Sequence, residues 1–292
     1  MRESSFDTGV VFINYAQGPP SGPPLVLLHG FPGRWQELLP ILPALSLRWH
    51  THALDLRGQG KSGRAPGQYR PEHYTADIKA FLQRHLTEPA VVFGLSAGGL
   101  IALDAAAQLP ERVRAVVIGD SPIDIDALIA LMNTDESAAH FAALRELAAS
   151  GRSLAELAVA LAQLPVWVPG QDKPIPYGDR PGVDDVHLRA WAKTVSQIDP
   201  GALEFHAEQR AAEFLSKLDM DELLSRIACP VLLVQGNPAL GAMLTSEAVD
   251  HAMSLLADGA HVLIEQTGHD LGLGNWEVAP LLRAVTDFLE SL

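Results

Sequence analysis

Short apolar runs recur along the chain and define the expected strands. They are rich in valine, leucine and alanine, and they are Leu25–Leu28, Thr51–Leu54, Ala90–Leu95, Val113–Ile118, Val231–Gln235 and Ala260–Glu265. Runs that are apolar throughout are typical of strands buried on both faces of a parallel sheet. An earlier run, Val10 to Tyr15, reads as a further strand, and we expect the proline-rich segment 18–24 to be a hairpin loop that joins it to Leu25–Leu28.

Helical patterns separate these runs. The segment Pro71 to Leu86 carries its apolar residues on one face at helical spacing, and Leu100–Leu109 is apolar almost throughout, as a buried helix would be. Strands that alternate with helices predict an α/β fold: a mostly parallel sheet flanked by helices on both faces.

The alternation stops between Pro122 and Asp221. This stretch has no convincing strand, and its helical patterns cover 125–132, 137–149, 153–164 and 184–196. Because strand patterns resume afterwards, we interpret the stretch as an insertion between two strands of one sheet. The expected organisation is a core domain, residues 1–121 and 222–292, interrupted by a helical cap, residues 122–221.

Composition and charge exclude several classes of function. Of the 292 residues, 48% are hydrophobic and 19% charged, which indicates a globular chain. With 35 acidic and 21 basic residues, the net charge of −14 disfavours a nucleic-acid partner. The single cysteine, Cys229, excludes an internal disulfide. No signal peptide or membrane-spanning run of about 20 residues is visible, so we expect a cytoplasmic protein without a membrane partner. The sequence does not indicate an oligomeric state.

The strongest chemical signal is the sequence from Gly94 to Gly98, which matches G-x-S-x-G around Ser96. It lies between the strand run Ala90–Leu95 and the helix run Leu100–Leu109. A serine in such a tight strand-to-helix turn is forced outward at the end of the sheet. The helix N-terminus that follows it favours developing negative charge. We therefore predict that Ser96 is a nucleophile.

A serine nucleophile needs a base and a site for the oxyanion. His269 follows the last strand run and precedes the C-terminal helix, so it lies at the same sheet edge as Ser96. Acyl transfer also needs two donors that face the oxyanion. The expected pair is the backbone N–H of Ala97, directly after the nucleophile, and that of Phe31, in the loop His29–Gly33. His50 and His52 have a metal-ligand spacing, but without a third ligand we expect no metal.

Together, the loop His29–Gly33, the turn at Ser96, the inserted cap and the final histidine resemble the α/β-hydrolase family. The resemblance covers nearly the whole chain and implies an eight-stranded type of sheet. The loop His29–Gly33 is similar to that of epoxide hydrolases and haloalkane dehalogenases. Those enzymes have an aspartate nucleophile, whereas Ser96 points to esterases, lactonases and carbon–carbon bond hydrolases.

The third member of the expected triad, a carboxylate that orients the histidine, departs from the family pattern. The family usually places it after the seventh strand. This chain has no acid there, and the polar side chain at that place is the amide of Asn237. A known alternative places it after the sixth strand, and there Asp120 follows Val113–Ile118. We favour Asp120; Asp124, Glu247 and a substitute role for Asn237 remain alternatives.

The resemblance implies a serine hydrolase that cleaves a small or medium, mainly apolar carboxylic ester through an acyl-enzyme, without a cofactor. A lactonase or a carbon–carbon bond hydrolase with the same triad is one alternative, and a hydrolase-like binding or receptor protein with little turnover is another. The expected partner is a small-molecule substrate. Apolar and aromatic residues that we expect to line its pocket are Trp35, Met132, Phe141, Trp167, Tyr177 and Trp191.

Overall fold

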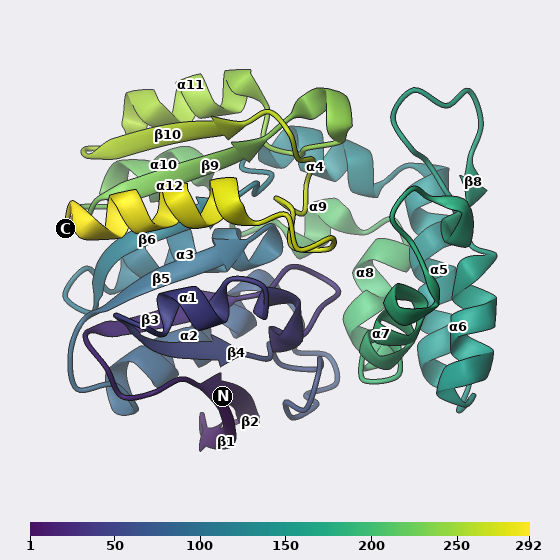
Figure 1. Cartoon of the computed structure of the whole chain (residues 1–292), viewed down its shortest axis with the longest axis horizontal. Coiled ribbons are helices and arrows are strands. Elements are labelled where there is room, and N and C mark those ends of the chain that lie inside the picture. Colours follow the sequence, from purple (N-terminus) through teal and green to yellow (C-terminus); the bar gives the residue numbers. More distant parts are fainter.

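The computed structural model describes residues 1–292 and contains one eight-stranded sheet (Figure 1). Its strands, in spatial order, are β1 (Arg2–Asp7), β2 (Phe12–Gln17), β4 (His50–Leu54), β3 (Pro24–Leu28), β5 (Ala90–Leu95), β6 (Val113–Gly119), β9 (Val231–Gly236) and β10 (Gly259–Ile264). All neighbours from β4 to β10 pair in parallel, whereas β2 is antiparallel to both β1 and β4. The predicted fold class is confirmed.

Helices cover both faces of the sheet. One face packs against α2 (Pro71–Arg84), α3 (Ala97–Gln108), α10 (Met220–Arg226) and α11 (Ser246–Leu255), and the other against α1 (Leu42–Leu45) and α12 (Ala279–Glu290). The two cores divide single strands: Val26 and Leu28 face one, Leu25 and Leu27 the other. Adjacent residues of a strand point to opposite faces, so uninterrupted apolar runs follow directly from burial on both sides.

Six of the helices between β6 and β9 precede α10, and most of them lie beyond one end of the sheet (Figure 1); we refer to this insertion as the cap. They are α4 (Ile125–Met132), α5 (Asp135–Ala149), α6 (Leu154–Ala162), α7 (Asp185–Val195), α8 (Glu204–Ala207) and α9 (Ala211–Phe214). The sequence indicated no strand here, but two-residue strands, β7 (Pro165–Val166) and β8 (Ile175–Pro176), pair antiparallel. A buried contact ties the cap to the core: the Tyr69 hydroxyl donates to Asp199 Oδ2 at 2.6 Å.

The expected hairpin between the second and third strands is wrong. Instead, β2 pairs with β4, and β4 separates it from β3, so the segment 18–24 crosses one end of the sheet. The actual hairpin partner of β2 is β1, whose sequence RESSFD is too polar to stand out as a strand. Strand β10 is also less buried than expected, because it lies at the sheet edge. No helix is long and apolar enough to cross a membrane.

The pH dependence of stability depends in part on His52, which lies in β4 with its side chain fully enclosed. Neither ring nitrogen has a hydrogen-bond partner, and the rings of His50 and His85 lie 4.3 and 5.7 Å away between centroids. Burial, with a smaller contribution from these two neighbours, lowers the pKa of His52 to about 3. The folded protein therefore holds His52 neutral.

We expect the free energy of unfolding to fall as the pH drops below 6.5. Between about pH 3 and 6.5 the unfolded chain binds a proton at His52 that the folded chain does not, so acid favours unfolding. Urea unfolding at pH 7 and 4.5 should show about 2 kcal/mol of this loss in the wild type. The variant His52→Leu should lose correspondingly less, and equal losses in the two proteins would contradict the assignment.

Candidate active site

Ser96 lies in the tight turn that joins β5 to α3. Its backbone has φ 52° and ψ −122°, a conformation that L-residues rarely adopt. The turn is closed so tightly that a Cβ on Gly94 would lie 2.2 Å from the carbonyl oxygen of Gly98. The G-x-S-x-G pattern is therefore a steric requirement of the turn. The surrounding strand and helix hold the strained serine in place.

Three side chains from distant parts of the sequence form one chain of hydrogen bonds. Ser96 Oγ lies 3.0 Å from His269 Nε2, and His269 Nδ1 lies 2.7 Å from Asp120 Oδ2. A carboxylate only accepts hydrogen bonds, so Nδ1 carries the proton and donates it to Asp120. Nε2 is then free to accept from the Ser96 hydroxyl, which is the arrangement that a serine nucleophile and its base require.

Asp120 directly follows β6 and is completely buried. Its carboxylate accepts backbone N–H groups of Gly236 at 3.0 Å and Met243 at 2.7 Å, besides the imidazole of His269. Both amides belong to the end of β9 and the loop after it. In the family the segment after this strand usually supplies the acid. Here its backbone N–H groups instead hold Asp120, which follows the neighbouring strand β6.

The loop 29–33 lies against the serine: a Cβ on Gly30 would be 3.4 Å from the Ser96 Cβ. The backbone N–H of Phe31 makes no backbone hydrogen bond. Ala97 is the first residue of α3, so its N–H has no partner within the helix. These are the two groups that the sequence singled out as oxyanion donors.

Buried polar side chains fix the shape of this loop. His29 is fully enclosed, donates from Nδ1 to the carbonyl of Gly30 at 2.6 Å and accepts from the backbone of Leu56 at 3.0 Å. Burial lowers the pKa of His29, so its ring stays neutral as this pattern requires. Asp55 accepts the backbone N–H of Trp35 at 2.8 Å. The loop after β4 therefore supports the loop after β3.

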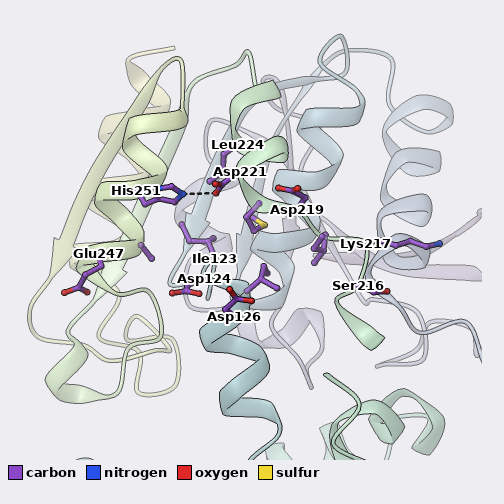
Figure 2. A pocket seen from close by; sticks show the side chains of 14 residues that line it. Ile123, Asp124, Asp126, Ser216, Lys217, Asp219, Asp221, Leu224, Glu247 and His251 are labelled. Carbon is purple, nitrogen blue, oxygen red and sulfur yellow. Dashed lines mark hydrogen bonds and ion pairs between the residues drawn. The ribbon is translucent and has the colours of Figure 1, made fainter. Parts of the chain in front are cut away.

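The other candidate acids lie away from His269. Asp124 caps α4 through the backbone N–H of Ala127, and Asn237 caps a short helical turn after β9. Glu247 and Asp124 both line a cleft of about 710 Å³ between α4, α10 and α11, which none of Ser96, Asp120 and His269 lines. Figure 2 shows the acidic side chains of this cleft and the hydrogen bond between His251 and Asp221. Only Asp120 contacts the histidine.

Most of the residues that we expected to line the substrate pocket lie elsewhere in the structure. Trp35 lies elsewhere: it is buried in the core on the face of the sheet that α1 and α12 cover, and its Nε1 donates to Glu3 at 2.9 Å. Met132 is buried in the other core, and Trp191 packs against that core. Trp167 is 55% exposed next to β7. The Tyr177 hydroxyl lies 2.9 Å from His187 Nε2 within the cap.

Phe141 lies beside the loop 29–33. Its ring stacks on Phe31 with 6.3 Å between centroids. Sequence reasoning missed His206, whose ring packs against both phenylalanines, at 4.9 Å from Phe31 and 4.5 Å from Phe141 between centroids. Nothing local distinguishes His206 from the other cap histidines, since the contact joins α8 to a loop 175 positions earlier.

Comparisons with known proteins identify the family and the fold. Residues 23–274 match the family model described as alpha/beta hydrolase fold. A curated 2-(acetamidomethylene)succinate hydrolase of Mesorhizobium japonicum is 24% identical over 289 residues, 98% of this chain and 94% of that protein. Among solved structures, an N-formylmaleamic acid deformylase of Pseudomonas putida S16 is similar with TM-score 0.74, 18% identity and coverage of 97% and 100% of the two chains.

An enol-lactonase of Burkholderia xenovorans LB400 is similar with TM-score 0.70 and 20% identity, covering 98% of this chain and 100% of that one. The family model spans most of the chain, from before β3 to beyond His269, and so includes the strands and turns that carry the three hydrogen-bonded side chains. This chain belongs to the α/β-hydrolase family and is a hydrolase of that fold.

Proposed function

We propose that this protein is a serine hydrolase that cleaves a small or medium, mainly apolar carboxylic ester through an acyl-enzyme. The observation that carries the proposal is the hydrogen-bond chain Ser96–His269–Asp120, with separations of 3.0 and 2.7 Å. These distances fall within the reach needed for proton transfer from the nucleophile to its base.

The reaction follows from the geometry. Ser96 Oγ attacks the ester carbonyl while its proton passes to His269 Nε2. The imidazolium that forms is stabilised by the buried carboxylate of Asp120. The tetrahedral oxyanion is held by the backbone N–H groups of Phe31 and Ala97. The leaving alcohol then takes the proton from His269, which leaves an acyl group on Ser96.

Water completes the cycle by the same route in reverse. His269 takes a proton from the water that attacks the acyl-enzyme, and the carboxylic acid leaves as Ser96 regains its proton. No step requires a cofactor. A lactone would follow the same steps with the alcohol retained in the product. The apolar rings of Phe31 and Phe141 beside the oxyanion loop support an apolar acyl or alcohol group.

The first test is hydrolysis of 4-nitrophenyl butanoate combined with labelling by a fluorophosphonate. We expect the wild type to turn over the ester and to be labelled on Ser96, and Ser96→Ala to lose at least about 10⁴-fold in kcat/KM. The control is Ser225→Ala, because Ser225 lies exposed on α10 and bonds only Glu222 of its own helix. Equal turnover by Ser96→Ala and wild type would contradict the proposal.

A further inference from the structure

The cap and the oxyanion loop meet at a cluster of four rings. His206, from α8, lies 4.9 Å from Phe31, 4.5 Å from Phe141 and 5.3 Å from Phe214, measured between ring centroids. Its plane is nearly parallel to that of Phe31, at 21°. His206 is the only one of the four rings with polar atoms, and it contacts Phe31, which belongs to the loop that lies against Ser96.

The two nitrogens of this ring have different surroundings. The residue His206 is 8% exposed, and its Nδ1 is buried without a hydrogen-bond partner. Nε2 is not enclosed in this way and has no partner in the protein. Burial lowers the pKa of His206 to about 4, so the ring is neutral and carries one proton. A buried N–H without an acceptor is costly, which favours the proton on Nε2, where another molecule can accept it.

We propose that His206 positions the substrate by donating a hydrogen bond from Nε2 to a second oxygen of the substrate, apart from the scissile ester. The substrate class is then an ester that also carries a keto or carboxylate oxygen, in either the acyl part or the leaving group. This inference rests on the proposed serine hydrolase function. A ring that served only to fill the cluster would need no nitrogen, as the three phenylalanines around it show.

The experiment compares matched esters with and without the second oxygen. On the acyl side, 4-nitrophenyl 4-oxopentanoate is compared with 4-nitrophenyl pentanoate, and on the leaving-group side 4-acetylphenyl butanoate with 4-ethylphenyl butanoate. The quantity measured is the preference, the ratio of kcat/KM within each pair. Comparing this preference between wild type and variant cancels the intrinsic reactivity of the esters.

Two replacements of His206 separate its nitrogen from its ring. His206→Phe keeps the stacking and removes the donor, so we expect the preference for the oxygenated ester to fall about tenfold in at least one pair. His206→Gln loses the ring but keeps an N–H near the position of Nε2, and it should retain the preference within about threefold. Rescue by glutamine is a result that a purely structural role of the ring does not give.

Phe214→Leu is the control for loosened packing, since Phe214 touches the same ring and has no polar atom in its side chain. Its preference should match that of the wild type. The inference is overturned if His206→Phe keeps both preferences, or if Phe214→Leu loses them equally. If the wild type hydrolyses none of the four esters, the proposed function fails as well, whereas turnover with unchanged preferences removes the His206 inference alone.

Discussion

Replacing Asp120 with asparagine should lower kcat for 4-nitrophenyl butanoate by about 10⁴-fold at neutral pH. The carboxylate of Asp120 accepts the N–H groups of Gly236 and Met243 and the Nδ1 proton of His269. An asparagine amide has one acceptor oxygen, so its NH₂ group must replace either Oδ1, which accepts from Gly236, or Oδ2, which accepts from both Met243 and the imidazole of His269. If it faces the imidazole, the proton of His269 moves to Nε2, and the ring no longer accepts a proton from Ser96.

In either orientation the NH₂ group opposes a backbone N–H, that of Gly236 or that of Met243, in a fully buried site, which destabilises the folded state. Either outcome removes the charge that stabilises the imidazolium. Steady-state kinetics should therefore be combined with a thermal unfolding scan. Matched controls are Glu247→Gln and Asp124→Asn, which alter the other acids near this end of the sheet without touching His269. An active Asp120→Asn together with an inactive Glu247→Gln would show that the acid is assigned wrongly.

The largest expected loss of stability comes from Arg57→Met. The guanidinium of Arg57 donates two hydrogen bonds to Asp77, at 2.6 and 2.7 Å, and both side chains are almost fully buried. The arginine joins the loop after β4 to α2. Its removal leaves the carboxylate of Asp77 buried and unpaired, which should lower the free energy of unfolding by about 3–5 kcal/mol. Urea unfolding followed by circular dichroism measures the change.

A double-mutant cycle isolates the cause of this loss. Adding Asp77→Leu to Arg57→Met removes the unpaired charge, so the double variant should be more stable than Arg57→Met alone. The comparison pair is Arg226 and Glu222, which form an ion pair on the exposed face of α10. Glu222→Ala should cost no more than about 0.5 kcal/mol, because solvent screens that pair. Equal losses at the two sites would mean that burial does not set the energy.

The parts of the fold that were predictable are those with a local signal. Strands β5 and β9 are apolar throughout because both faces of the sheet are covered, and the pattern located them to within a residue or two. Strand β1 carries no such signal, since its residues lie at an edge and are mostly exposed. The order of β2, β4 and β3 depends on pairing between segments that are distant in the sequence. The turn-like composition of the segment 18–24 does not indicate which strands pair.

The site divides in the same way. The turn at Ser96 has a steric signature in its glycines, and the place of His269 follows from the strand before it. Asp120 could be named as a candidate from its position after β6, but its contact with His269 depends on how two loops fold together. The contact of Trp35 Nε1 with Glu3 in β1 likewise joins distant segments and has no local signal. His206 contacts Phe31 across the cap interface, where no sequence pattern reports which side chains meet.

The position of Asp120 on the sheet has a consequence for how this enzyme can change. Ser96 and Asp120, the proposed nucleophile and acid, follow two adjacent, centrally placed strands, β5 and β6, and Asp120 is held by main-chain amides at the end of β9 and in the segment after it. Only the backbone of that segment contacts Asp120, so its side chains have no part in the proposed hydrogen-bond chain. Substitutions in that segment and in the cap, whether natural or engineered, can therefore change the binding surface without displacing Ser96, His269 or Asp120.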